Sequence, residues 1–281
     1  MDQATIDKIG QQLEQRIAGK SLALPMLPQV TNQVLSLVND SDSDAAELAK
    51  LIQSDPALAG HVMRIANSAA YSPNAQMTSL QQAIARLGMQ NMAEIAMAAT
   101  MGPKLFPAQG FEQLIKDIWQ SSLATGVWAR EIARQGRRNV ESTFLCGLLY
   151  QIGKPVVLQT VLDIVSNSEA DTVADTVDGL MDVYHSKVGA VLAEHWQLPS
   201  AVLHTVLGVD SDGAAVGSQD IVDTVKAARV FATCTVADRN YDTESLSIDR
   251  YIVAINLYAD DVQVLLDKVD SVHDTISALT L

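Results

Sequence analysis

The feature that most constrains this chain is an apolar stretch at residues 141–152, where hydrophobic side chains fall on nearly every side of a helix. A helix that is apolar all round is stable only when other elements cover every side of it. Apolar residues recur at helical spacing in the neighbouring segments, and no segment shows sustained strand alternation with turn signals. The sequence therefore predicts an all-α protein around a central helix, which we expect Gly153 to end.

Signals for helix ends punctuate the first hundred residues. Asp44 and Ser79 are each followed three positions later by Glu or Gln, which is the pattern of a capping box. Asp55 precedes Pro56, and these two residue types favour the N-cap and the first helical position. Gly88 is a natural stop for the helix that Ser79 begins. These signals predict several short helices with tight connections.

The clearest break in the chain lies between Gly102-Pro103 and the segment from Pro107 to Gly110. Pro and Gly interrupt helices and mark turns, so two such clusters close together suggest a boundary. We predict an N-terminal helical subdomain at residues 1–107. Residues 108–281 are then a helical bundle with a C-terminal helical extension.

The charge balance limits the classes of partner. The chain has 281 residues and a formal net charge of −14. Lys and Arg supply most of the affinity for nucleic acid and for anionic membranes, so we expect neither as a partner. The first residues are polar and acidic, unlike a signal peptide, and no stretch approaches about 18 uninterrupted apolar residues. We therefore expect a cytoplasmic protein.

A series of short motifs in the first part of the chain carries a family resemblance. The motifs are Leu24-Pro25-Met26-Leu27-Pro28, Glu47-Leu48-Ala49 with Ile52, Asp55-Pro56, Arg64-Ile65-Ala66-Asn67-Ser68 and Ala83-Ile84-Ala85-Arg86-Leu87-Gly88. In this order and spacing they resemble the HDOD (HD-related output domain) family over roughly residues 20–215. The resemblance implies an HD-domain-like helical bundle with an additional N-terminal helical subdomain, and a bacterial regulatory role.

Asn67 and Ser68 allow two interpretations. Their side chains can satisfy backbone groups where a helix ends, which is the commoner use of these residue types. The alternative is that they line a groove between the two subdomains and contact a ligand there.

A second motif, Gly147-Leu148-Leu149-Tyr150-Gln151-Ile152-Gly153-Lys154, resembles the central helix of HD phosphohydrolases. That helix normally reads Gly-Leu-Leu-His-Asp-Ile-Gly-Lys, and its His-Asp pair binds a divalent metal that activates water. Tyr150 and Gln151 replace the pair here. Ser121 stands where the family has an upstream His, and Val209-Asp210 stand where a downstream His pair would follow. The comparison predicts no catalytic residue, no metal site and no cofactor.

His185 is the one histidine at a His position of the family pattern. A lone imidazole is most simply a hydrogen-bonded, partly buried side chain, although it can also contact a ligand or a partner. His195 lies about 15 Å further along the same predicted helix, so the two histidines cannot ligate one metal.

Three functions stay open on this evidence. The leading hypothesis is a non-catalytic regulatory module that binds a protein partner or a small effector through a vestigial pocket of Ser121, Tyr150, Gln151 and His185, with Asn67 and Ser68. The first alternative is a metal-dependent phosphohydrolase with a rearranged ligand set of Asp163, Asp182, His185 and Asp210. The second is a sensor that binds a nucleotide around Tyr150, Gln151 and His185.

Overall fold

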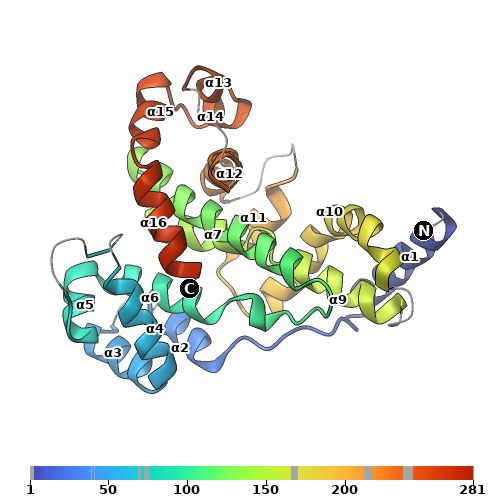
Figure 1. Cartoon of the computed structure of the whole chain (residues 1–281), viewed down its shortest axis with the longest axis horizontal. Helices are drawn as coiled ribbons and strands as arrows, with labels where there is room; N and C mark the ends of the chain where they lie inside the picture. The colour runs from blue at the N-terminus through green and yellow to red at the C-terminus, as the bar shows by residue number, and fades with distance from the viewer. Residues whose placement is uncertain are drawn as a thin grey trace.

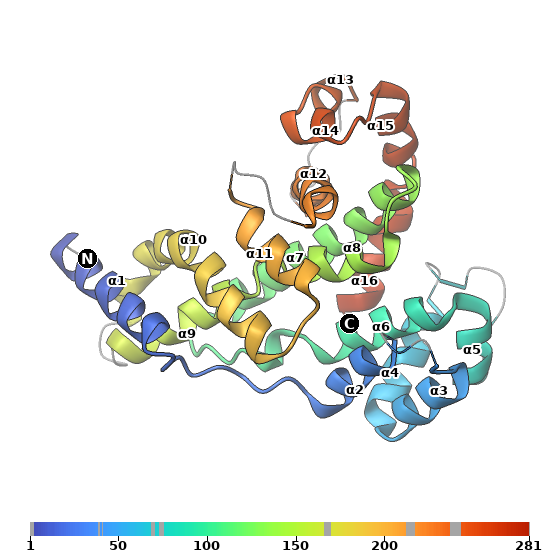
Figure 2. The same ribbon diagram turned by 180° about the vertical axis from the view of Figure 1, so that it is seen from behind.

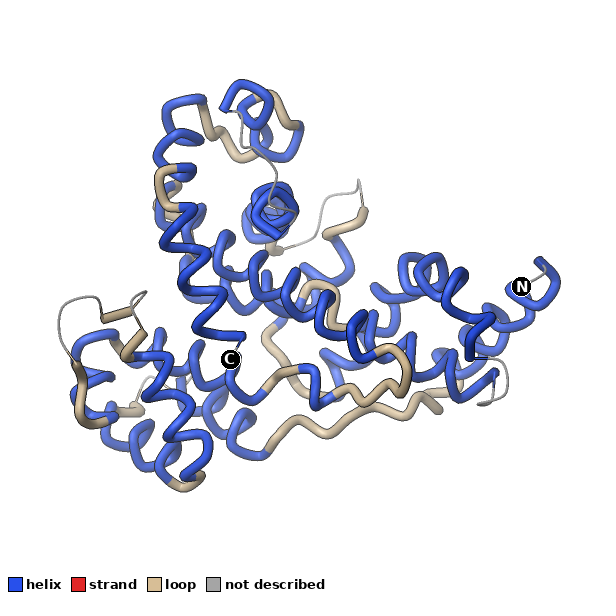
Figure 3. Tube along the Cα trace, viewed as in Figure 1, coloured by secondary structure: helices blue, strands red, loops and turns tan. Residues whose placement is uncertain are grey.

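The computed structural model describes residues 3–38, 40, 42–68, 71–72, 76–165, 170–211, 217–236 and 243–280. Within these ranges the chain is helical and has no strand, which confirms the predicted all-α class. Figures 1 and 3 show the helices and their connections. Their bounds are α1 Gln3–Ala18, α2 Gln29–Val38, α3 Ala45–Gln53, α4 Pro56–Ala66, α5 Leu80–Leu87, α6 Met89–Thr100, the 3-10 turn η1 Pro103–Leu105, α7 Glu112–Gln135, α8 Val140–Leu149, α9 Gly153–Val165, α10 Ala170–His195, α11 Ser200–Gly208, α12 Gln219–Val236, α13 Thr243–Ser247, α14 Arg250–Ala254, α15 Ala259–Leu266 and α16 Val269–Thr280.

The short N-terminal helices begin and end as their sequences predict. Asp44 accepts hydrogen bonds from the amides of Ala46 and Glu47 in a full capping box, and Asp55 caps α4 ahead of Pro56. Gly88 ends α5 with a φ of 86°, a value that L side chains rarely adopt. Helices α2 to α6 pack on one another at one end of the molecule (Figure 1).

Helix α1 lies apart from that group. It packs against α9 and α10, and a long extended segment connects it to α2 across the molecule (Figure 2). The predicted division at residue 107 stays a prediction, but residues 3–18 contact the second part of the chain rather than α2 to α6.

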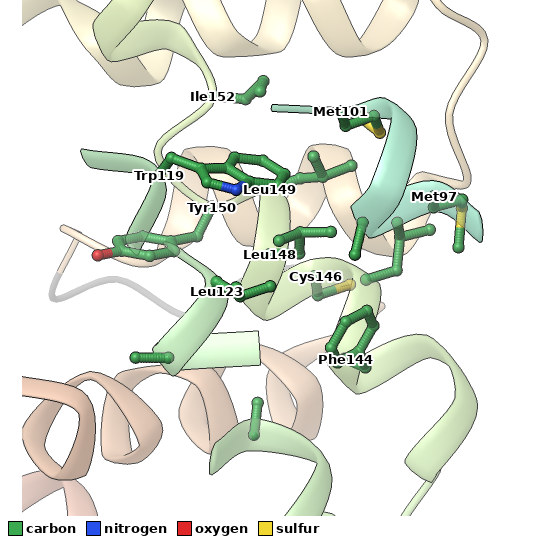
Figure 4. Packing of buried hydrophobic residues seen from close by; sticks show 14 of the residues in the cluster. Met97, Met101, Trp119, Leu123, Phe144, Cys146, Leu148, Leu149, Tyr150 and Ile152 are labelled. Atoms are coloured by element: carbon green, nitrogen blue, oxygen red, sulfur yellow. The ribbon is translucent and has the colours of Figure 1, made fainter. Parts of the chain in front are cut away.

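Helix α8 is central, as its composition predicts. It crosses α7 and also contacts α6, α11 and α12. Figure 4 shows Phe144, Cys146, Leu148 and Leu149 of α8 packed among neighbouring side chains, including Trp119 of α7 and Met101, which follows α6. The stretch Ser142–Val165 is apolar and long enough to cross a membrane, but 83% of its most apolar window is buried inside the fold.

Gly153 does not end a helix as expected. Helix α8 already ends at Leu149, and Gly153 is the first residue of α9. A Cβ atom at position 153 would lie 2.0 Å from the backbone oxygen of His185. The glycine is therefore required by the close packing of α9 against α10, which is a tertiary constraint.

Candidate functional site

A close helix crossing brings Ser121 and Tyr150 together. A Cβ atom on Gly147 of α8 would lie 2.8 Å from the Cα atom of Gly126 in α7, so the two backbones touch. This contact fixes the C-terminal end of α8 against the middle of α7. The Ser121 and Tyr150 hydroxyl oxygens are 3.5 Å apart as a result.

Gln151 lies beside Tyr150 in the turn between α8 and α9, but its side chain is committed elsewhere. Its Nε2 atom donates to the backbone oxygen of Ile118 and to Ser122 Oγ, at 3.0 Å each. Tyr150 is 4% exposed and Gln151 5% exposed. These contacts tie the turn to α7 and leave the amide nitrogen no bond to spare for a ligand.

His185 enters the same region from α10 and is 3% exposed. Its Nε2 atom lies 2.9 Å from Asp210 Oδ2, while the buried Nδ1 atom has no hydrogen-bond partner among the residues that the structure describes. This geometry favours the tautomer in which Nε2–H donates to the carboxylate, because a proton on Nδ1 would be a buried donor without an acceptor.

Asp210 holds His185 on one side and Arg229 on the other. Arg229 Nη1 of α12 lies 2.6 Å from Asp210 Oδ1, and its guanidinium carbon lies 5.2 Å from the centre of the Tyr150 ring. The hydrogen bond from His185 is the largest cause that lowers the pKa of Asp210; Arg229 adds to it, and burial acts in the opposite sense. Asp210 is therefore a carboxylate at neutral pH.

The structure thus gathers Ser121, Tyr150 and His185 in one polar cluster that Asp210 and Arg229 complete. Sequence reasoning missed Arg229, which comes from the C-terminal extension. The available signal was an arginine set between buried positions of an apolar helix, Ala228 and Phe231.

Asn67 and Ser68 lie outside this cluster, at the end of α4. Asn67 Nδ2 donates to the backbone oxygens of Met63 and Met77, and its Oδ1 accepts from the amide of Met77. Asn67 therefore bridges the end of α4 to the segment before α5, the backbone role expected for this residue type. The hydroxyl oxygen of Ser68 is buried, and no described residue forms a hydrogen bond with it.

The residues at the family's metal positions do not fit a divalent ion. The catalytic His-Asp pair is replaced by a phenol and by an amide that already donates to α7, and the one imidazole is bonded to Asp210. Arg229 places a fixed positive charge against the only carboxylate of the cluster. In the described part of the chain, no three His, Cys, Asp or Glu side chains gather closely enough to hold an ion.

Two carboxylates of the rearranged ligand set pair with cations of their own. Asp182 contacts Lys154 at 2.8 Å, and Asp163 lies 3.8 Å from Arg16. Only His185 and Asp210 of that set touch each other.

Comparisons with known proteins agree with this picture of the fold. Residues 24–210 match the HDOD domain. An HDOD domain protein of Geobacter sulfurreducens superposes with a TM-score of 0.73 at 20% identity, covering 99% of this chain and 98% of its own. A Shewanella amazonensis SB2B protein named as a candidate metal-dependent phosphohydrolase gives 0.72 at 18% identity, covering 98% and 99%.

Two further relatives are longer than this chain. A Marinobacter aquaeolei VT8 protein, named as a candidate signal transduction protein, superposes with a TM-score of 0.63 at 18% identity and is covered over 66% of its length. An uncharacterised protein of Treponema pallidum (strain Nichols) is 24% identical over 198 residues, which are 68% of this chain and 38% of that protein.

Proposed function

The chain belongs to the HDOD domain family, and on that premise we propose that it is a regulatory module of bacterial signal transduction that binds a protein partner and hydrolyses no phosphate ester. The signal-transduction name of the Marinobacter protein supports the regulatory part of this proposal. We further propose that the module acts in the cytoplasm. Its net charge of −14 disfavours a nucleic-acid or anionic-membrane partner.

One observation supports the proposal that the chain is not a hydrolase: the guanidinium of Arg229 contacts Asp210 and balances its negative charge. In a metal-dependent hydrolase a divalent ion balances such carboxylates and activates the attacking water. Here the Arg229 side chain balances the charge of Asp210, and a guanidinium does not activate a water molecule for attack on phosphorus. The cluster thus ties α10 and α12 to the turn after α8 through the contacts of Asp210 with His185 and Arg229 and of Arg229 with Tyr150.

Burial favours a protein partner over a nucleotide at the old pocket. Tyr150, Gln151 and His185 are each at least 95% buried. A nucleotide could stack on Tyr150 only after Arg229 left the face of the ring, which would break its pair with Asp210. A partner protein needs no such opening, because it would bind the outer surface of the helices that this cluster holds together.

The test combines metal content with activity of the full chain. We expect elemental analysis to find well under one Mn, Fe, Mg or Zn per chain, and no hydrolysis of bis(p-nitrophenyl) phosphate with or without added Mn²⁺. The double variant Tyr150→His with Gln151→Asp should also be inactive, because Ser121 and Arg229 remain. Mn²⁺-dependent hydrolysis by the natural chain would overturn the proposal.

A second arm addresses the partner. The tagged chain should retain one stoichiometric protein from bacterial lysate, and nucleotides at millimolar concentration should neither displace it nor raise the melting temperature. A ligand that binds only the native state must raise that temperature, so a clear rise with one nucleotide would instead favour the sensor function.

A further inference from the structure

A cavity of about 390 Å³ lies where α6, α7 and α16 meet, and it shares no lining residue with the Tyr150 cluster. Its lining residues come from these helices and the segments beside them: Tyr71, Leu87, Asn91, Val127, Arg130, Glu131, Arg134, Lys268, Ser271, Val272 and Thr275. It therefore joins the N-terminal helices, the bundle and the C-terminal extension.

The lining is cationic in a chain that is strongly anionic. Arg130, Arg134 and Lys268 all line the cavity, and among the residues that the structure describes Glu131 is the one carboxylate in the lining. Glu131 contacts each of the three cations, at 3.4, 2.8 and 3.1 Å. Glu94 lies behind Arg130 at 3.6 Å, so the group keeps an excess of one positive charge.

Arg130 is the unusual member, because it is only 4% exposed and is poorly bonded. Its contacts to Tyr71, Glu131 and Glu94 are 3.3 to 3.6 Å long, whereas charge-assisted hydrogen bonds are usually about 2.7–2.9 Å. The described part of the chain offers no hydrogen-bond partner to its Nη2 atom, although Arg130 lines the cavity. A buried guanidinium with an open donor edge fits an oxyanion.

We propose that this cavity binds a small phosphate monoester. Arg130, Arg134 and Lys268 would bind the phosphate, with the hydroxyl of Tyr71 beside them. Ligand pockets of roughly 300–1,000 Å³ hold small organic molecules, so a free phosphate ion would fill little of this volume. Leu87, Val127 and Val272 form an apolar wall for the organic part.

Such a ligand would bridge parts of the fold that are otherwise joined weakly. Helix α16 packs mainly on α7 and touches α6 only slightly. A phosphate bound to Arg130, Arg134 and Lys268 would fasten α16 to α7 next to the Tyr71 segment, and would fix the C-terminal extension. The site is independent of the proposed partner-binding function.

The test is calorimetric titration of the full chain at low salt with two probes, glycerol 3-phosphate and inorganic phosphate. We expect glycerol 3-phosphate to bind more tightly. Arg134→Ala and Lys268→Ala, both at partly exposed positions, should each weaken it about tenfold, because each removes one charge-assisted contact. Lys116→Ala removes the same charge from an exposed position of α7 away from the cavity and should change nothing.

Glu131→Gln separates a ligand site from a purely structural ion network. It removes the carboxylate that competes with the ligand, so binding should tighten, whereas a structural network has no ligand to gain. Circular dichroism establishes that each variant is folded. The proposal is overturned if neither probe binds at millimolar concentration, if inorganic phosphate binds as tightly as the ester, or if Arg134→Ala and Lys268→Ala leave the affinity unchanged.

Discussion

Substitution of Gly153 by alanine tests the packing that positions His185. The added Cβ atom would lie 2.0 Å from the His185 backbone oxygen and 2.6 Å from the amide nitrogen of Gly189. Both neighbours are backbone atoms of α10, so neither can rotate away. Helices α9 and α10 must separate by about 1 Å or more to restore ordinary contact.

The expected loss of stability follows from that clash. Overpacking a tight interior costs about 1–3 kcal/mol, and an immovable backbone places this site at or above the upper end. The better helix propensity of alanine offsets roughly 1 kcal/mol. We expect a net loss of about 2–3 kcal/mol, seen as a fall of roughly 1 M in the urea midpoint followed by circular dichroism.

Gly179→Ala is the matched control. Gly179 is an exposed position within α10, and a Cβ atom there meets nothing within 4 Å. The same chemical change should therefore stabilise the protein by about 0.5–1 kcal/mol. If Gly153→Ala unfolds at the wild-type urea concentration or above it, the close approach of α9 and α10 is refuted.

Three further predictions concern buried polar groups. Arg130→Met should cost about 3–5 kcal/mol in urea unfolding, since it removes a buried cation that pairs with Glu94 and Glu131; adding Glu94→Gln should recover part of that loss, and additive losses would contradict the pairing. Burial raises the pKa of the Cys146 thiol to about 12. In a Cys234→Ser variant, which leaves Cys146 as the remaining thiol, Ellman's reagent should therefore react with Cys146 only when the protein unfolds. Fast reaction of Cys146 in the folded protein would contradict this prediction. Because the pKa of Asp210 is lower in the folded chain than in the unfolded chain, where it is near 4, its ionisation stabilises the fold above about pH 4, and this stabilisation is lost as the pH falls toward the folded pKa. Asp210→Asn should therefore make the melting temperature depend less on pH below about pH 4. An unchanged pH dependence in that range would count against the pairing of Asp210 with His185 and Arg229.

The helix ends could be predicted from the sequence because the residues that determine each of them lie within a few positions of one another. Asp44, Asp55 and Ser79 cap helices as their sequence context indicates, and Gly88 takes the positive φ that its position suggested. The apolar pattern of residues 141–152 likewise required a buried central helix, since no solvent-facing side was available.

Features that depend on two distant segments could not be read in the same way. Gly153 looked like a helix end, but its role is set by a backbone oxygen 32 positions later, at His185. Arg229 reaches Tyr150 from a helix beyond the matched family region, and no spacing rule links the two. Asp210 was considered only as a metal ligand, although its partners are an imidazole and a guanidinium.

We propose that a guanidinium, and no metal ion, balances the charge of Asp210 where α10 and α12 meet the turn after α8. Anomalous scattering from crystals soaked in Mn²⁺ measures this most directly. We expect no anomalous peak within bonding distance of His185 or Asp210, and we expect Arg229 to remain in contact with the carboxylate. A peak held there by three or more side chains, with Arg229 displaced, would contradict it.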